Sequence, residues 1–126
     1  DVAVPISAYP DLIRYVETLR EAEQVTLYMI GHAGDGNIHV EFPYSDDSEF
    51  TRAMHCNQLV VRKALALGGT ATGEHGVGIG KSKYMPEEHG TSLDVMWAIK
   101  QALDPNNILN PGKIFPATIS VPSPVV

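Results

Sequence analysis

The chain has 126 residues, of which 44% are hydrophobic and 19% charged, and this composition suits one globular domain with a modest core. Its formal charge of -6 argues against nucleic acid or an anionic membrane as a partner, because both attract concentrated Lys and Arg. The single cysteine, Cys56, cannot form an internal disulfide, and no segment approaches the ~20 apolar residues of a membrane helix. We expect a soluble domain from a reducing compartment, with a cytoplasmic location favoured and peripheral membrane attachment left open.

The first half of the chain predicts a strand, a helix and two further strands. A short apolar segment over residues 1–6 predicts a strand that ends near Pro5. Apolar residues at helical spacing then predict an amphipathic helix over about 9–23. Two β-prone runs predict strands over 25–30 and 38–42.

The second half predicts a helix, a short strand, another helix and an extended tail. An apolar stripe from Phe50 to Leu65 predicts a long helix, which Gly68-Gly69 should end. A fourth strand is predicted over 70–72, and a last helix over about 93–103. The predicted fold is therefore α+β: a ferredoxin-like βαββαβ sandwich with an added C-terminal helix and tail.

The hairpin between the two central strands determines where two histidines lie. Its loop contains Asp35-Gly36, a dipeptide typical of two-residue type I′ turns. With that turn, His32 lies directly opposite His39 on the polar face of the sheet, with Cβ atoms roughly 5 Å apart. A three-residue loop would place the two histidines on opposite faces. Two such imidazoles can bind one divalent metal ion, although an exposed pair without a ligand is the simpler alternative.

A glycine-rich segment over 73–81 offers a third ligand and a base. Glu74 follows a glycine, so its carboxylate can approach the histidines through a backbone with few steric limits. His32, His39 and Glu74 together would leave coordination positions open, as catalytic metal sites do. His75 would then face whatever the metal holds, and an imidazole suits general-base catalysis near neutral pH.

Three motifs resemble one known family. They run from Gly31 to His39, from Thr72 to Gly78 and from Leu103 to Lys113. In order and spacing they resemble the C-terminal part of the FAD-linked oxidases, flavoenzymes of the vanillyl-alcohol-oxidase type that include cytochrome-type D-lactate dehydrogenases and the glycolate oxidase D subunit. The resemblance covers residues 1–116 as a C-terminal cap domain and leaves 117–126 as a flexible tail.

The resemblance implies an activity, two cofactors and several residue roles. These enzymes oxidise a D-2-hydroxy acid to the 2-oxo acid and pass a hydride to FAD, which a separate N-terminal domain binds. By the same resemblance, His32, His39 and Glu74 bind zinc or manganese, and His75 is the base near the substrate. Asn110 lies in the segment that returns toward the flavin domain, so it is our candidate cofactor contact.

The chain departs from the family's pattern in two respects. It holds neither the FAD-binding domain nor the upstream half of the cap, so we expect a fragment that needs the flavin domain and is inactive alone. Glu41 would repel a second substrate carboxylate, which favours a small monocarboxylate such as D-lactate or glycolate. The electron acceptor stays open, and a homo-oligomer is compatible with the sequence.

Two alternative functions use the same residues differently. A stand-alone ferredoxin-like module would bind a ligand or a partner without FAD and without catalysis. A small metal-dependent hydrolase would act on esters or phosphates through the two histidines and Glu74. The sequence offers no phosphate-binding loop for the second alternative, because His75 stands where the P-loop pattern before Gly80-Lys81-Ser82 requires glycine.

Overall fold

The computed structural model describes residues 1–116, and it divides the chain into two compact units. The first unit is Asp1–Gly76, and the second begins at Val77. Each unit is described by itself below. The tail predicted over 117–126 lies outside the described residues.

The first unit is built on an antiparallel sheet. Its central strand is β3 (Asn37–Glu41), which pairs with β1 (Val2–Ala3) on one side and with β2 (Tyr28–His32) on the other. Ala3 also forms a single antiparallel bridge with Thr70, in the segment where a fourth strand is predicted. The described residues therefore form an α+β unit with three strands, and the ferredoxin-like sandwich of four strands stays a prediction.

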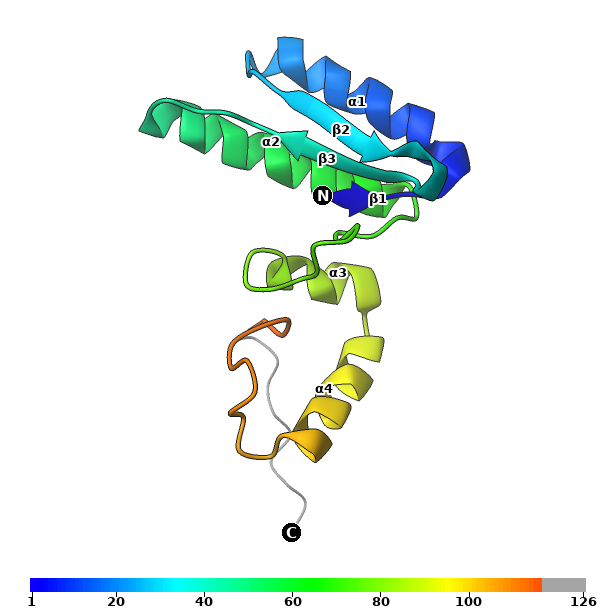
Figure 1. The fold of residues 1–126 in the computed structure, drawn as a ribbon, viewed down its shortest axis with the longest axis vertical. Coiled ribbons are helices and arrows are strands. Elements are labelled where there is room, and N and C mark those ends of the chain that lie inside the picture. The colour runs from blue at the N-terminus through cyan, green and yellow to red at the C-terminus, as the bar shows by residue number, and fades with distance from the viewer. Residues whose placement is uncertain (117–126) are drawn as a thin grey trace. The chain divides into compact units, whose positions relative to one another are not determined.

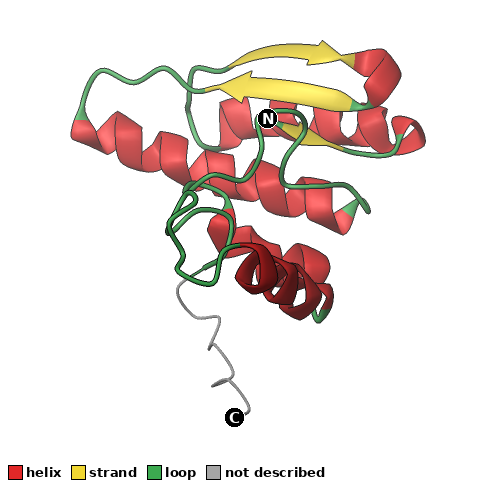
Figure 2. Ribbon diagram, turned by 60° about the horizontal axis from the view of Figure 1, so that its bottom comes forward, coloured by secondary structure: helices red, strands yellow, loops and turns green. Residues whose placement is uncertain are grey.

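Two helices cover one face of this sheet (Figures 1 and 2). Helix α1 (Tyr9–Ala22) has Pro10 in its first turn, where a missing N–H breaks no helical hydrogen bond. Helix α2 (Asp47–Ala66) begins after Asp46, whose side chain accepts the backbone N–H of Glu49. Both helices are confirmed within a few residues of their predicted bounds. The opposite face of the sheet carries the exposed side chains of β2.

The core of the first unit lies between these helices and the sheet. Apolar residues recur at helical spacing on α1 and α2 and at alternate positions on β3, so that one side of each element is buried. The largest fully buried side chains are those of Leu12, Val16, Ile38, Cys56, Val61 and Val2. Burial is the main cause that raises the pKa of the Cys56 thiol, so this sulfur is a packing group and a poor nucleophile.

The second unit contains α3 (Met85–His89) and α4 (Ser92–Leu103). The sequence predicts α4 but not α3, because five residues that include Pro86 give no helical period. Buried hydrophobic residues of the unit are Tyr84, Met85 and Leu93, and Asp104 is a buried charged residue. None of the helices in the described part of the chain is both long enough and apolar enough to cross a membrane.

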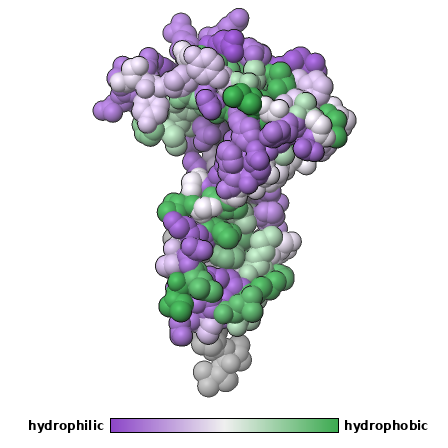
Figure 3. All heavy atoms as spheres, in the orientation of Figure 1, coloured by the Kyte–Doolittle hydropathy of each residue, from purple (hydrophilic) through white to green (hydrophobic). Residues whose placement is uncertain are grey.

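Large apolar side chains gather on the surface of the second unit (Figure 3). Three of them, Val95, Ile99 and Leu103, recur every four residues along α4 and are 62%, 57% and 78% exposed. This spacing places them on one face of the helix. Because these side chains are exposed, the packing inside the unit does not depend on them.

Candidate metal centre

The loop of the β2–β3 hairpin is longer than predicted. Four residues, Ala33–Gly36, connect the strands, and the first three form a 3₁₀ turn. Gly36 ends the turn in the left-handed region with φ 70°. A Cβ at this position would lie 2.0 Å from the carbonyl oxygen of Val4, so only glycine fits. The predicted two-residue type I′ turn is therefore wrong.

The longer loop shifts the register of the hairpin by two residues. His39 pairs with Ile30, and His32 pairs with Asn37, so the two histidines are diagonal neighbours rather than directly opposite. A shift by two keeps every side chain on its predicted face. Both histidines lie on the face away from the helices, and their ring centroids are 6.0 Å apart. The shared face is confirmed, whereas the direct pairing is wrong.

Glu74 reaches the two histidines from the turn that follows residue 72. Its Oε1 lies 2.7 Å from His39 Nε2 and 3.7 Å from His32 Nε2. The ligand atoms of these three residues all lie within 4.8 Å of one another. Donors bound tetrahedrally to one ion at ~2.1 Å are separated by about 3.4 Å. Two imidazole nitrogens and a carboxylate oxygen at this spacing fit a divalent metal such as zinc or manganese.

His75 lies beside these three residues with its ring stacked on that of His39. The ring centroids are 4.8 Å apart and the ring planes differ by 28°. Nδ1 of His75 faces Asp1 Oδ2 at 4.0 Å, which leaves Nε2 on the other edge of the ring. The side chain is 64% exposed. An imidazole in this position can accept a proton from a small molecule that lies against the three ligand atoms.

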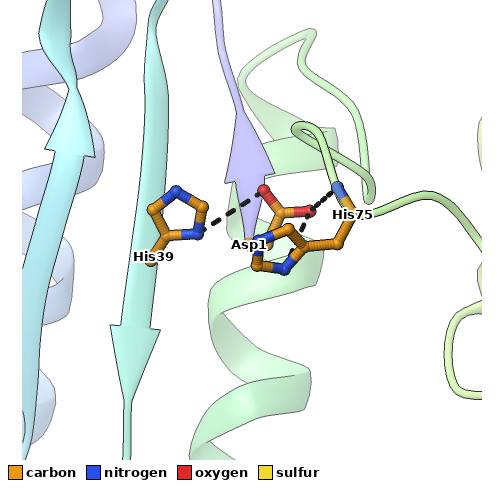
Figure 4. Close-up of side chains that lie close together, drawn as sticks. All are labelled: Asp1, His39 and His75. Carbon is orange, nitrogen blue, oxygen red and sulfur yellow. Dashed lines mark hydrogen bonds and ion pairs between the residues drawn. The ribbon is translucent and has the colours of Figure 1, made fainter.

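Asp1 belongs to the same cluster, and the sequence analysis missed it. Figure 4 shows its carboxylate between His39 and His75, with Oδ1 3.8 Å from His39 Nδ1. The carboxylate accepts the backbone N–H groups of Gly73, Glu74 and His75 at 3.0 to 3.3 Å. The available signal was an acidic residue directly before the first strand, which pairs with the strand that carries His39.

An open depression of about 490 Å³ lies against this cluster, within the size range of small-molecule sites. Its lining residues come from β2, β3, Asp1 and the turn after residue 72: Asp1, Ile30, His39, Val40, Glu41, Glu74 and His75. Glu41, the predicted substrate neighbour, therefore lines the same depression as the predicted base, His75. Asn110 lies in the second unit, where it is exposed with φ 47°, and its predicted cofactor contact stays a prediction.

Comparison with known proteins identifies the family of this chain. Residues 1–114 match the family model described as FAD linked oxidases, C-terminal domain, and the chain belongs to this family. It is 44% identical over 119 residues to the mitochondrial D-lactate dehydrogenase (cytochrome) of Arabidopsis thaliana, a match that covers 92% of this chain and 21% of the relative. The resemblance inferred from the three motifs is thus confirmed.

Two further relatives agree with this assignment. The chain is 45% identical to the mitochondrial D-lactate dehydrogenase (cytochrome) 1 of Saccharomyces cerevisiae, over 91% of this chain and 20% of the relative. It is 37% identical to the glycolate oxidase subunit GlcD of Bacillus subtilis, over 91% of this chain and 25% of the relative. The chain therefore spans about a fifth to a quarter of the length of these relatives.

Proposed function

We propose that this chain is the substrate-facing part of an FAD-linked enzyme that oxidises a D-2-hydroxy acid to the 2-oxo acid. The observation that carries the proposal is the convergence of His32, His39 and Glu74 beside the open depression. The names of the relatives support D-lactate or glycolate as the substrate class. FAD would be bound by other parts of a longer protein. This chain covers only a fifth to a quarter of the length of its relatives.

His32, His39 and Glu74 are the proposed metal ligands. A zinc or manganese ion supplies Lewis acidity when bound, which lowers the pKa of a coordinated hydroxyl group. Three protein donors leave coordination positions for oxygen atoms of the substrate. His39 is the most buried of the three proposed ligands: its side chain is only 18% exposed, whereas those of His32 and Glu74 are 62% and 48% exposed.

His75 is the proposed base, with Nε2 as the nitrogen that would accept the proton. Because Nδ1 faces Asp1, Nε2 is the atom available to the substrate hydroxyl group. His75 would take this proton as the C–O bond of the substrate becomes a carbonyl. A bound flavin would supply the two-electron acceptor for the hydride that leaves the α-carbon.

Glu41 is the proposed specificity residue. It is exposed on β3, two positions beyond His39, and it lines the same depression. Its charge repels a second carboxylate on a bound acid, whereas a monocarboxylate places only a methyl group or hydrogen there. This arrangement favours D-lactate or glycolate over dicarboxylic hydroxy acids.

Metal binding by the purified 126-residue chain tests the proposal. We expect titration calorimetry to give one zinc or manganese ion per chain. His39→Ala and Glu74→Gln should each weaken this binding by more than the ~10–100-fold typical of residues that only support a ligand. His55→Ala removes an exposed histidine of α2 and is the matched control. A wild-type chain that binds neither ion, or site variants that bind as the wild type does, would contradict the proposal.

A further inference from the structure

The carboxylate of Asp1 is buried, although Glu74 and His75 of the same cluster are exposed. The side chain of Asp1 is 3% exposed, compared with 48% for Glu74 and 64% for His75. A buried carboxylate is costly unless hydrogen bonds replace its water. The groups that satisfy Asp1 therefore indicate what this residue does.

Three consecutive backbone N–H groups point at this carboxylate. Gly73 N–H donates to Oδ2 at 3.0 Å, His75 N–H donates to Oδ2 at 3.1 Å, and Glu74 N–H is shared between both oxygens at 3.1 and 3.3 Å. Successive amides that converge in this way form an anion-binding concavity. The amide Nδ2 of Asn37, on β3, completes the set with a longer contact to Oδ1 at 3.4 Å.

The position of Gly73 shows how tightly the turn approaches Asp1. A Cβ at this residue would lie 2.3 Å from Asp1 Oδ1 and 2.5 Å from Asn37 Nδ2. These separations are far inside van der Waals contact, so any side chain would push the turn away from the carboxylate. Glycine at 73 is therefore part of the same arrangement as the three hydrogen bonds.

Asp1 also faces both neighbouring rings. Its oxygens lie 3.8 Å from Nδ1 of His39 and 4.0 Å from Nδ1 of His75, which are electrostatic contacts too long for hydrogen bonds (Figure 4). A carboxylate on the Nδ1 side orients an imidazole so that Nε2 points the other way. In both rings, Nε2 is the nitrogen that the proposed function requires.

A direct role for Asp1 as a metal ligand fits less well. Asp1, His39 and His75 also have ligand atoms within 4.8 Å of one another. However, both oxygens of Asp1 already accept backbone hydrogen bonds. In that case His39 would have to bind one ion through Nδ1 and a second ion, beside Glu74, through Nε2. A neutral imidazole has only one nitrogen lone pair that can bind a metal ion.

We propose that Asp1 is a positioning residue whose carboxylate holds the turn 73–75, so that Glu74 faces His39 and His75 stacks on it. The consequence for metal binding rests on the proposed function, whereas the anchoring of the turn does not. The two parts are therefore tested by separate measurements.

Amide hydrogen exchange in the metal-free chain tests the anchoring. Asp1→Asn keeps the size of the side chain but removes its charge and one acceptor oxygen. We expect exchange at Gly73, Glu74 and His75 to accelerate at least tenfold, while the backbone-bonded amide of Thr70 is unchanged. Asp11→Asn, at an exposed carboxylate of the same unit, is the matched control. Equal exchange at the turn in both variants would overturn the proposal.

The wild-type chain provides a second measurement in case Asp1→Asn does not fold. The amides of the turn should exchange at least tenfold more slowly than the same amides in an unstructured peptide, because all three are bonded to Asp1. Exchange at the peptide rate would overturn the anchoring without any variant.

Zinc titration then separates this inference from the proposed function. We expect Asp1→Asn to bind zinc ~10–100-fold more weakly than the wild type, with unchanged stoichiometry. Unchanged affinity together with faster exchange at the turn would overturn the positioning of Glu74. If the wild-type chain binds no zinc, the proposed function fails, and the exchange data alone then support or overturn the anchoring.

Discussion

The role proposed for His75 is to move a proton rather than to bind a metal ion. Its Nδ1 faces Asp1 at 4.0 Å, which would leave Nε2 for the substrate. Asparagine at this position keeps a polar side chain of similar size but cannot act as a base. The two roles proposed for the cluster, proton transfer and metal binding, can therefore be separated at one residue.

We expect His75→Asn, made in the proposed FAD-linked enzyme, to lower the turnover of its proposed substrate, D-lactate or glycolate, by about 10²–10⁴-fold. Zinc affinity should stay within threefold of the wild type, because the three ligands are untouched. Steady-state kinetics and titration calorimetry measure the two effects. Loss of zinc binding in this variant would indicate that His75 is a metal ligand and not the base.

The sequence was sufficient to predict four of the cluster residues but not the fifth. His32, His39, Glu74 and His75 lie in glycine-rich motifs whose residue types already indicate metal and proton chemistry. Asp1 lies in no such motif, and the backbone amides that bond to it are 72 to 74 residues away. A contact of that separation depends on the assembled sheet, which a local pattern does not describe.

At the scale of elements, the hairpin shows why a strand face is easier to predict than a register. The alternation of apolar and polar side chains assigned each residue of β2 and β3 to its face. The register depended on one dipeptide, Asp35-Gly36, and this signal was misleading. Gly36 is left-handed as expected, but it ends a 3₁₀ turn that adds two residues to the loop.

The length of this loop predicts a difference between odd and even insertions. One glycine inserted within Ala33–Gly36 should weaken zinc binding at least ~100-fold, because a shift by one residue moves His32 to the helix-covered face. Two glycines inserted at the same point should retain binding within tenfold, because a shift by two residues keeps His32 on its original face. Titration calorimetry on both variants measures the contrast. Tight binding after the single insertion would show that the strands absorb it elsewhere.

The remaining elements follow the same distinction between strong and weak signals. Helices α1 and α2 are long and strongly periodic, and both were predicted near their observed bounds. The fourth strand is a single bridge at Thr70, because only a few β-prone residues stand between Gly69 and Gly73. Neither this bridge nor the short α3 has enough residues to produce a period.

At the scale of the whole chain, the second unit has an apolar surface that is not buried within the unit. Val95, Ile99 and Leu103 are exposed along α4, whereas Leu93, in the first turn of the same helix, is 3% exposed. Substituting the exposed residues should therefore change the free energy of unfolding of the second unit less than substituting Leu93.

We expect Ile99→Ser and Leu103→Ser to change the free energy of unfolding of the second unit by less than about 0.5 kcal/mol each. Leu93→Ala should lower it by about 2–5 kcal/mol, because it leaves a cavity in the interior. Amide exchange of α4 measures both effects. A loss above 1 kcal/mol in the serine variants would mean that these side chains are covered when the protein is in solution.

The contact between Asp1 and the turn at residue 73 also bears on the order in which contacts form during folding. Contacts between distant segments form late, because the intervening chain must first be brought together. A growing polypeptide that has released only β1, β2 and β3 already holds His32 and His39, but it still lacks Glu74. Binding of an ion by the three proposed ligands would therefore require the turn after residue 72, which belongs to the last segment of this unit.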